Sequence, residues 1–165
     1  MDKSFKKRMV DFIYPTNRVK RKYLLKNPTE TVLASDACKG IVTSKNKDIQ
    51  RDASWITAQR AVILLTDKNI VCGKWIIPLE DVRSAHLITF SSLLTGKGQV
   101  LKIQTKDDKF YQFGMEYNPE WTNQSILPMT TEKGEVKYST FSIILRVLII
   151  GLLIYWIYEK FVKST

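Results

Sequence analysis

The sequence predicts a mainly β domain that lies between a basic N-terminal arm and an apolar C-terminal helix. Short segments rich in β-branched and aromatic residues alternate with polar turns from Thr29 onward. Residues 1–28 hold nine Lys and Arg against Asp2 and Asp11, which gives a net charge of +7. Residues 141–158 hold a single formal charge, Arg146. In a chain of 165 residues, these observations favour one compact domain with an extension at each end.

The arm, residues 1–28, carries most of the positive charge of the chain. Phe5, Met9, Phe12 and Ile13 recur at helical spacing, so they predict a helix whose apolar stripe lies on a membrane or on protein. A second basic cluster follows Pro15. Each Lys or Arg near an anionic surface contributes about 1 kcal/mol of attraction, so we expect the arm to bind anionic lipid. A solvated arm without a specific partner is the alternative. The expected contacts are Lys3, Lys6, Lys7, Arg8, Arg18, Lys20, Arg21, Lys22 and Lys26.

The domain is expected over residues 29–128. Its candidate strands are Thr31–Ala34, Gly40–Ser44, Ser54–Thr57, Ala61–Thr66, Asn69–Cys72, Lys74–Pro78, Val82–Phe90, Gln99–Thr105 and Lys109–Gly114. Alternation of apolar and polar residues from Leu101 to Lys106, followed by a polar turn, predicts a hairpin with one buried face. Asn118 and Pro119 then predict the start of a short helix, limited by Pro128, that covers an open end of the sheets.

The C-terminal part is expected to contain a polar connector (129–140), a transmembrane helix (141–158) and a short tail (159–165). A helix of eighteen residues rises roughly 27 Å, close to the thickness of the hydrocarbon core of a bilayer. A buried central helix of a soluble domain is the alternative, but the remaining residues could hardly surround it. Most Lys and Arg precede the segment, which favours a single-pass protein with its domain in the cytoplasm and its C-terminus outside or in a lumen.

Arg146 would then lie within the membrane. Its long side chain could reach back to the cytoplasmic headgroups, or it could pair with an acid on another transmembrane helix. The second interpretation implies a membrane-protein partner.

Three motifs carry a family resemblance: LLTDKNIVCGKWIIPLEDV (64–82), GQVLKIQTKDDKFYQFG (98–114) and NPEW (118–121). Together they resemble the GRAM and PH-like domains. The resemblance implies two packed antiparallel sheets that form a partly open barrel, with a C-terminal capping helix. It also implies binding of phosphoinositides or other membrane lipids, or a role as a protein-interaction scaffold.

Lys45, Lys47 and Arg51 form the candidate headgroup loop inside the domain, although Asp48 and Asp52 dilute their charge. Residues 29–140 hold fourteen Lys and Arg against thirteen acids, a net charge of only +1. Because the domain offers no broad basic face, general attraction of the arm to lipid is favoured over a stereospecific pocket, and nucleic acid is not an expected partner.

The sequence offers no pattern typical of catalysis or of a metal centre. It contains none of the common nucleophile, phosphate-binding or metalloprotease motifs, and its single histidine, His86, lies in a predicted strand. Cys38 and Cys72 have no companion cysteines, which favours reduced, buried thiols, although a disulfide between them stays open. We therefore expect neither an enzyme nor a cofactor, metal or small-molecule substrate. The predicted function is that of a membrane-tethered PH-like adaptor for anionic lipid or partner proteins; the alternative is an accessory subunit of a larger membrane complex.

Overall fold

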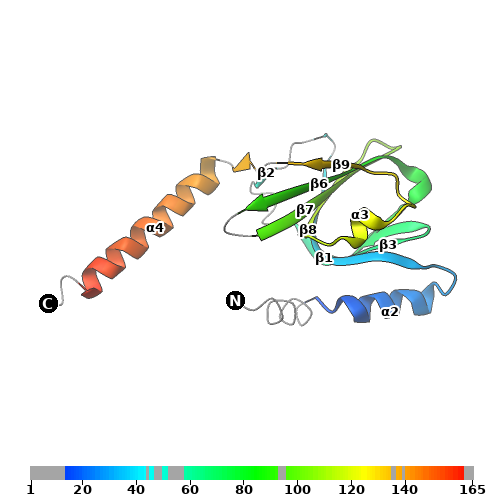
Figure 1. Ribbon diagram of the computed structural model, residues 1–165, viewed down its shortest axis with the longest axis horizontal. Coiled ribbons are helices and arrows are strands. Elements are labelled where there is room, and N and C mark those ends of the chain that lie inside the picture. The colour runs from blue at the N-terminus through cyan, green and yellow to red at the C-terminus, as the bar shows by residue number, and fades with distance from the viewer. Residues whose placement is uncertain are drawn as a thin grey trace.

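The computed structural model describes residues 14–43, 45–46, 50–51, 58–92, 96–134, 137–138 and 140–161. Within them, eight strands form one sheet in the order β5-β4-β3-β1-β8-β7-β6-β9 (Figure 1). The strands are β1 (Val32–Thr43), β3 (Gln59–Thr66), β4 (Asn69–Cys72), β5 (Trp75–Pro78), β6 (Val82–Ser92), β7 (Gly96–Thr105), β8 (Phe110–Glu116) and β9 (Thr130–Lys133). A second, small sheet pairs β2 (Gln50–Arg51) with β10 (Lys137–Tyr138). The helical elements are α2 (Thr16–Lys26), the short 3-10 helix η2 (Leu79–Asp81), α3 (Glu120–Asn123) and α4 (Thr140–Phe161).

Strand β1 joins the two halves of the sheet. Its first part pairs antiparallel with β3, and from Cys38 onward it also pairs antiparallel with β8. The expected strands at 31–34 and 40–44 are therefore one continuous strand, and the expected two sheets are one. The polar residues between the two apolar stretches stay in the ladder because their backbone groups bond to neighbours whatever their side chains are. The prediction of a mainly β domain is confirmed, whereas the prediction of two separate sheets is wrong.

Local turn chemistry fixes two hairpins. Cys72 pairs with Trp75 across a two-residue loop whose first residue, Gly73, has a φ of 58°, a conformation that glycine adopts without strain. The β7–β8 hairpin, predicted from the sequence, turns at Asp108, which also has a positive φ of 56°. Aspartate tolerates this left-handed conformation better than most residues.

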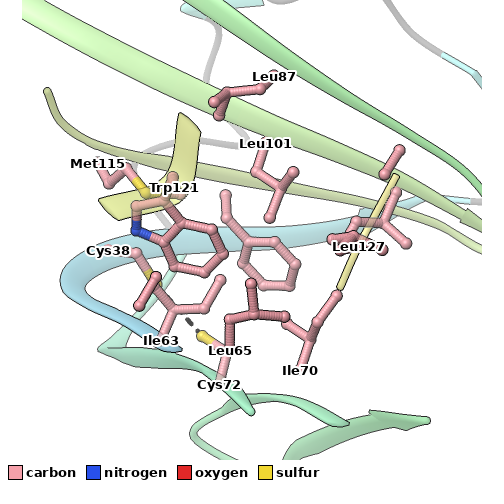
Figure 2. Packing of buried hydrophobic residues seen from close by; sticks show 14 of the residues in the cluster. Cys38, Ile63, Leu65, Ile70, Cys72, Leu87, Leu101, Met115, Trp121 and Leu127 are labelled. Atoms are coloured by element: carbon pink, nitrogen blue, oxygen red, sulfur yellow. Dashed lines mark hydrogen bonds between the residues drawn. The ribbon is translucent and has the colours of Figure 1, made fainter. Parts of the chain in front are cut away.

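Both halves of the sheet bury side chains in one core (Figure 2). Ile63 and Ile70 come from the β1–β5 half, and Leu101 and Phe113 from the β6–β8 half. The indole of Trp121 on α3 is fully buried in the same cluster. The short helix expected after Pro119 is present as α3. Its start is fixed by Asn118, whose Oδ1 accepts the Glu120 N–H at 3.0 Å.

Residues 130–133 lie in the range expected to be a polar connector. They form β9, which pairs in parallel with β6 and extends the sheet to its far edge. All four side chains are exposed, so neither apolar character nor alternation marked this strand in the sequence.

The expected transmembrane helix requires a correction. Residues 141–158 do lie in a helix, α4, which extends away from the sheet (Figure 1). However, no helix is both long and apolar enough to cross a membrane within the part of the chain that the structure describes. The transmembrane helix, and with it a membrane-tethered single-pass protein, is therefore not supported. Both interpretations of Arg146 depended on that helix; the side chain of Arg146 lies outside the described part.

Candidate functional site

The basic cluster that follows Pro15 is a helix, α2, packed against β1 and β3 (Figure 1). Val19 and Tyr23, one turn apart, are half-buried on the side that meets the sheet. Pro15 stands immediately before the first helical residue, and Lys26 lies in the last turn, where it complements the helix dipole. The basic cluster was predicted from the sequence, but the expected helix was placed before Pro15, although the spacing of Val19 and Tyr23 was the signal available for α2.

A polar network attaches α2 to the turn between β3 and β4. The Tyr23 hydroxyl donates to Glu30 Oε2 at 2.8 Å, and the Thr66 hydroxyl donates to the same oxygen at 2.8 Å. Asn69 Nδ2 donates to Glu30 Oε1 at 3.2 Å. One carboxylate therefore connects the helix, the segment before β1 and the β3–β4 turn.

The network shifts the pKa values of both titratable members. Burial, together with the hydrogen bond to Glu30 and its charge, raises the pKa of Tyr23 to about 12. Burial also opposes ionisation of Glu30, but the hydrogen bonds from Thr66, Tyr23 and Asn69 outweigh it and hold the pKa of this carboxyl below its ordinary value. A neutral tyrosine and an ionised glutamate are thus the stable pair near neutral pH.

The opposite face of α2 is basic and exposed. Arg18, Arg21, Lys22 and Leu25 stand at positions i, i+3, i+4 and i+7, so they lie along one side of the helix, with Lys26 beside them. All five side chains are exposed, and Leu25 has 77% of its surface open to solvent. We call these five residues the α2 face. No acid among the described residues forms an ion pair with its four cations.

The other predicted contact residues divide into four groups. Lys20 lies on α2 but is half-buried and belongs to the side nearer the sheet. Lys45 is exposed just beyond the end of β1, where its carbonyl accepts the Thr43 hydroxyl at 2.8 Å. Arg51 belongs to β2, but its side chain lies outside the described part. Lys3, Lys6, Lys7, Arg8 and Lys47 lie outside the described residues.

A cluster of acids lies on another part of the domain, near α3. The carboxyl of Asp36 accepts the Ala37 N–H at 2.8 Å. Burial raises its pKa to about 6, and the charges of Glu116 and Glu120 add to this shift. No group of three or more potential ligands in the described part of the chain could hold a metal ion.

The two cysteines face each other inside the core. Their Sγ atoms are 3.3 Å apart, both thiols are free, and both side chains are buried (Figure 2). The hydrogen bond to Cys72, together with burial, raises the pKa of Cys38, so this thiol stays protonated and unreactive. His86 is a half-buried residue of β6 whose Nδ1 lies 3.7 Å from a carboxylate oxygen of Glu132.

Comparison with known proteins adds no family assignment. No protein-family model matches the chain, and a search of the curated proteins found no match.

Proposed function

We propose that the chain is a PH-like adaptor that attaches to anionic phospholipid headgroups through the α2 face. The observation that carries this proposal is the row of exposed cations at Arg18, Arg21 and Lys22, which form no ion pair with a described acid, on a helix fixed to the domain. The strand order supports the PH-like assignment, because β1 pairs with both the β3–β5 part and the β6–β8 part and a short helix follows β8.

A fixed cationic face of this kind is better suited to contact a lipid surface than to enclose a single headgroup in a pocket. The three central cations span about one turn of helix, so they can contact several headgroups at once, each as a charge-assisted bond to phosphate or carboxylate. Attachment of this kind depends on the density of anionic lipid and weakens with salt, because exposed charges are screened over about 10 Å at moderate ionic strength.

Binding of the full chain to phospholipid vesicles tests the proposal. The Arg18→Gln, Arg21→Gln and Lys22→Gln triple variant loses three charges at the α2 face. At about 1 kcal/mol each, their removal should weaken binding to phosphatidylserine-containing vesicles by about 100-fold at low salt. Binding to vesicles made of phosphatidylcholine alone should not change.

A matched control removes three exposed lysines from the domain instead: Lys74→Gln, Lys106→Gln and Lys133→Gln. Both triple variants lower the formal net charge from +10 to +7. Any contribution of the apolar α4 to vesicle attachment is common to all the proteins compared, so the dependence on anionic lipid reports α2. If the two triple variants bind alike, net charge rather than the α2 face governs attachment, and the proposal is wrong.

We propose a second candidate function, an accessory subunit of a larger complex, on the basis of α4. Its described apolar side chains are exposed, among them Ile149, Leu152 and Trp156. Gentle purification of the full chain tests this candidate. Stoichiometric partners that are lost when Leu152 and Trp156 are both replaced by Gln would support it, and recovery of the chain without partners would contradict it.

A further inference from the structure

We propose that Leu25 is an apolar anchor that enters the hydrocarbon region when the cations around it contact headgroups. This inference rests on the proposed function and specifies how the same face is used. The inference rests on the placement of one exposed leucine, Leu25, among Arg21, Lys22 and Lys26, on a helix that the domain holds in place.

The position of Leu25 has no explanation within the domain. Val19 and Tyr23 already supply the apolar contact of α2 with the sheet, and Leu25 points to the opposite side. The network around Glu30 prevents α2 from rotating to bury it without breaking the bonds to Tyr23, Thr66 and Asn69. Because α2 is held in this orientation, the Leu25 side chain leaves water only when an apolar phase outside the domain covers it, and that transfer is favourable.

The surrounding charges indicate which partner covers it. A soluble polyanion such as a nucleic acid or an acidic polysaccharide offers phosphate or sulfate groups but no apolar phase for the leucine. A phospholipid surface offers both, anionic groups at the level of the cations and acyl chains just below. The long stems of Arg21 and Lys22 let their charges stay with the headgroups while the helix lies along the surface and Leu25 passes below them.

The depth of position 25 in a bilayer tests the inference in the full chain. Leu25→Cys can be labelled with an environment-sensitive dye, since the native Cys38 and Cys72 are buried and do not compete for the label. Ile76→Cys, labelled in the same way, is the matched control, because Ile76 is 64% exposed on β5, well away from α2 in the sequence. Vesicles contain phosphatidylserine and carry bromine quenchers on their acyl chains.

We expect the bromines to quench the dye at position 25 and to leave the dye at position 76 unquenched. In addition, Leu25→Gln should weaken binding to phosphatidylserine vesicles about tenfold relative to Ile76→Thr, the size expected when a leucine side chain is no longer buried. Binding to heparin should be the same for both variants, whereas Arg21→Gln should weaken binding to heparin and to vesicles.

Different results would contradict the role of Leu25 and the role of the α2 face. If the dye at position 25 is quenched no more than the dye at position 76, or if Leu25→Gln binds vesicles as tightly as Ile76→Thr, Leu25 is not an anchor. The proposed function survives that result as long as the triple variant of Arg18, Arg21 and Lys22 still loses anion-dependent binding. If the triple variant binds normally, the proposed function is wrong whatever the depth of position 25.

Discussion

Helices α2 and α4 both lie outside the sheet, yet their side chains meet opposite environments. In α2, one side packs on β1 and β3 while the other side presents cations to solvent. In α4, the described side chains from Val147 to Tyr158 are almost all apolar and all exposed. The domain therefore packs on one side of the first helix, whereas the second helix extends away from the sheet (Figure 1), and its described apolar side chains are uncovered.

The difference shows how a helix becomes part of a domain. An amphipathic helix needs only one contact, and α2 obtains it from a single face of the sheet and one carboxylate, Glu30. A helix that is apolar on every side needs partners all around, and packing against one face of a sheet would cover only one side of it. The functions of the two helices should therefore separate: α2 acts with the domain, and α4 acts through whatever covers it.

Truncation of one leucine near each helix should give the largest contrast. Leu64 lies on β3, which packs against α2, and is 1% exposed, whereas Leu152 on α4 is 68% exposed. Leu64→Ala should lower the free energy of unfolding by about 2–5 kcal/mol, because it removes buried contacts and leaves a cavity. Leu152→Ala should change it by less than about 0.5 kcal/mol. Urea denaturation of the two variants measures both; similar losses would mean that α4 packs on the domain.

Removal of the Glu30 carboxylate should loosen α2 selectively. Glu30→Ala leaves the Tyr23 hydroxyl and the Asn69 amide without this acceptor, at a cost of about 1–3 kcal/mol, while the Thr66 hydroxyl can still donate to the Asn69 carbonyl at 3.1 Å. Trypsin should then cleave within α2 faster than in the unsubstituted chain, since four exposed Lys and Arg lie there. Glu80→Ala, an exposed acid on η2, is the control. Unchanged cleavage of α2 would show that the apolar contact of Val19 and Tyr23 is sufficient.

The pH dependence of the same network offers a finer test. The pKa of Tyr23 in the folded protein, about 12, lies above its ordinary value of 10.0. The hydroxyl therefore contributes stability that is complete below pH 10 and is lost as the pH rises through about 12. The absorbance at 295 nm, compared between the unsubstituted chain and Tyr23→Phe, should isolate one phenol that titrates near 12. Glu30→Gln should lower that midpoint, because the hydrogen bond and charge of Glu30 contribute to the shift; a midpoint that stays put would contradict this origin.

Local chemistry decided which parts of this fold could be predicted from the sequence. The hairpin that turns at Asp108 and the helix that begins after Pro119 depend on residues close together in the chain, and both are present as expected. The continuity of β1 and the addition of β9 depend on strand partners far away in the sequence, so no local pattern predicted them. Backbone pairing tolerates polar side chains, which is why these strands escaped a search for apolar alternation.

The candidate site shows the same division. The charges of the arm could be read directly, and the cations of α2 are where the cluster was expected. The attachment of the helix could not be foreseen, since it brings together Tyr23, Glu30, Thr66 and Asn69 from three separate segments. The exposure of Leu25 follows from that attachment, because the side of α2 that faces solvent is fixed only once the opposite side is bound.

The smallest expected effect concerns Gly151, near the middle of the described part of α4. A Cβ added at this position would meet no described atom within 4 Å. Gly151→Ala should therefore stabilise the helix locally by up to about 1 kcal/mol through its higher helix propensity, and leave the unfolding of the domain unchanged. Hydrogen exchange of the α4 amides should slow by up to about fivefold, the equivalent of that free energy. Faster exchange in the variant would mean that a neighbour approaches the backbone closely at Gly151, and the contrast between a covered α2 and an uncovered α4 would no longer hold.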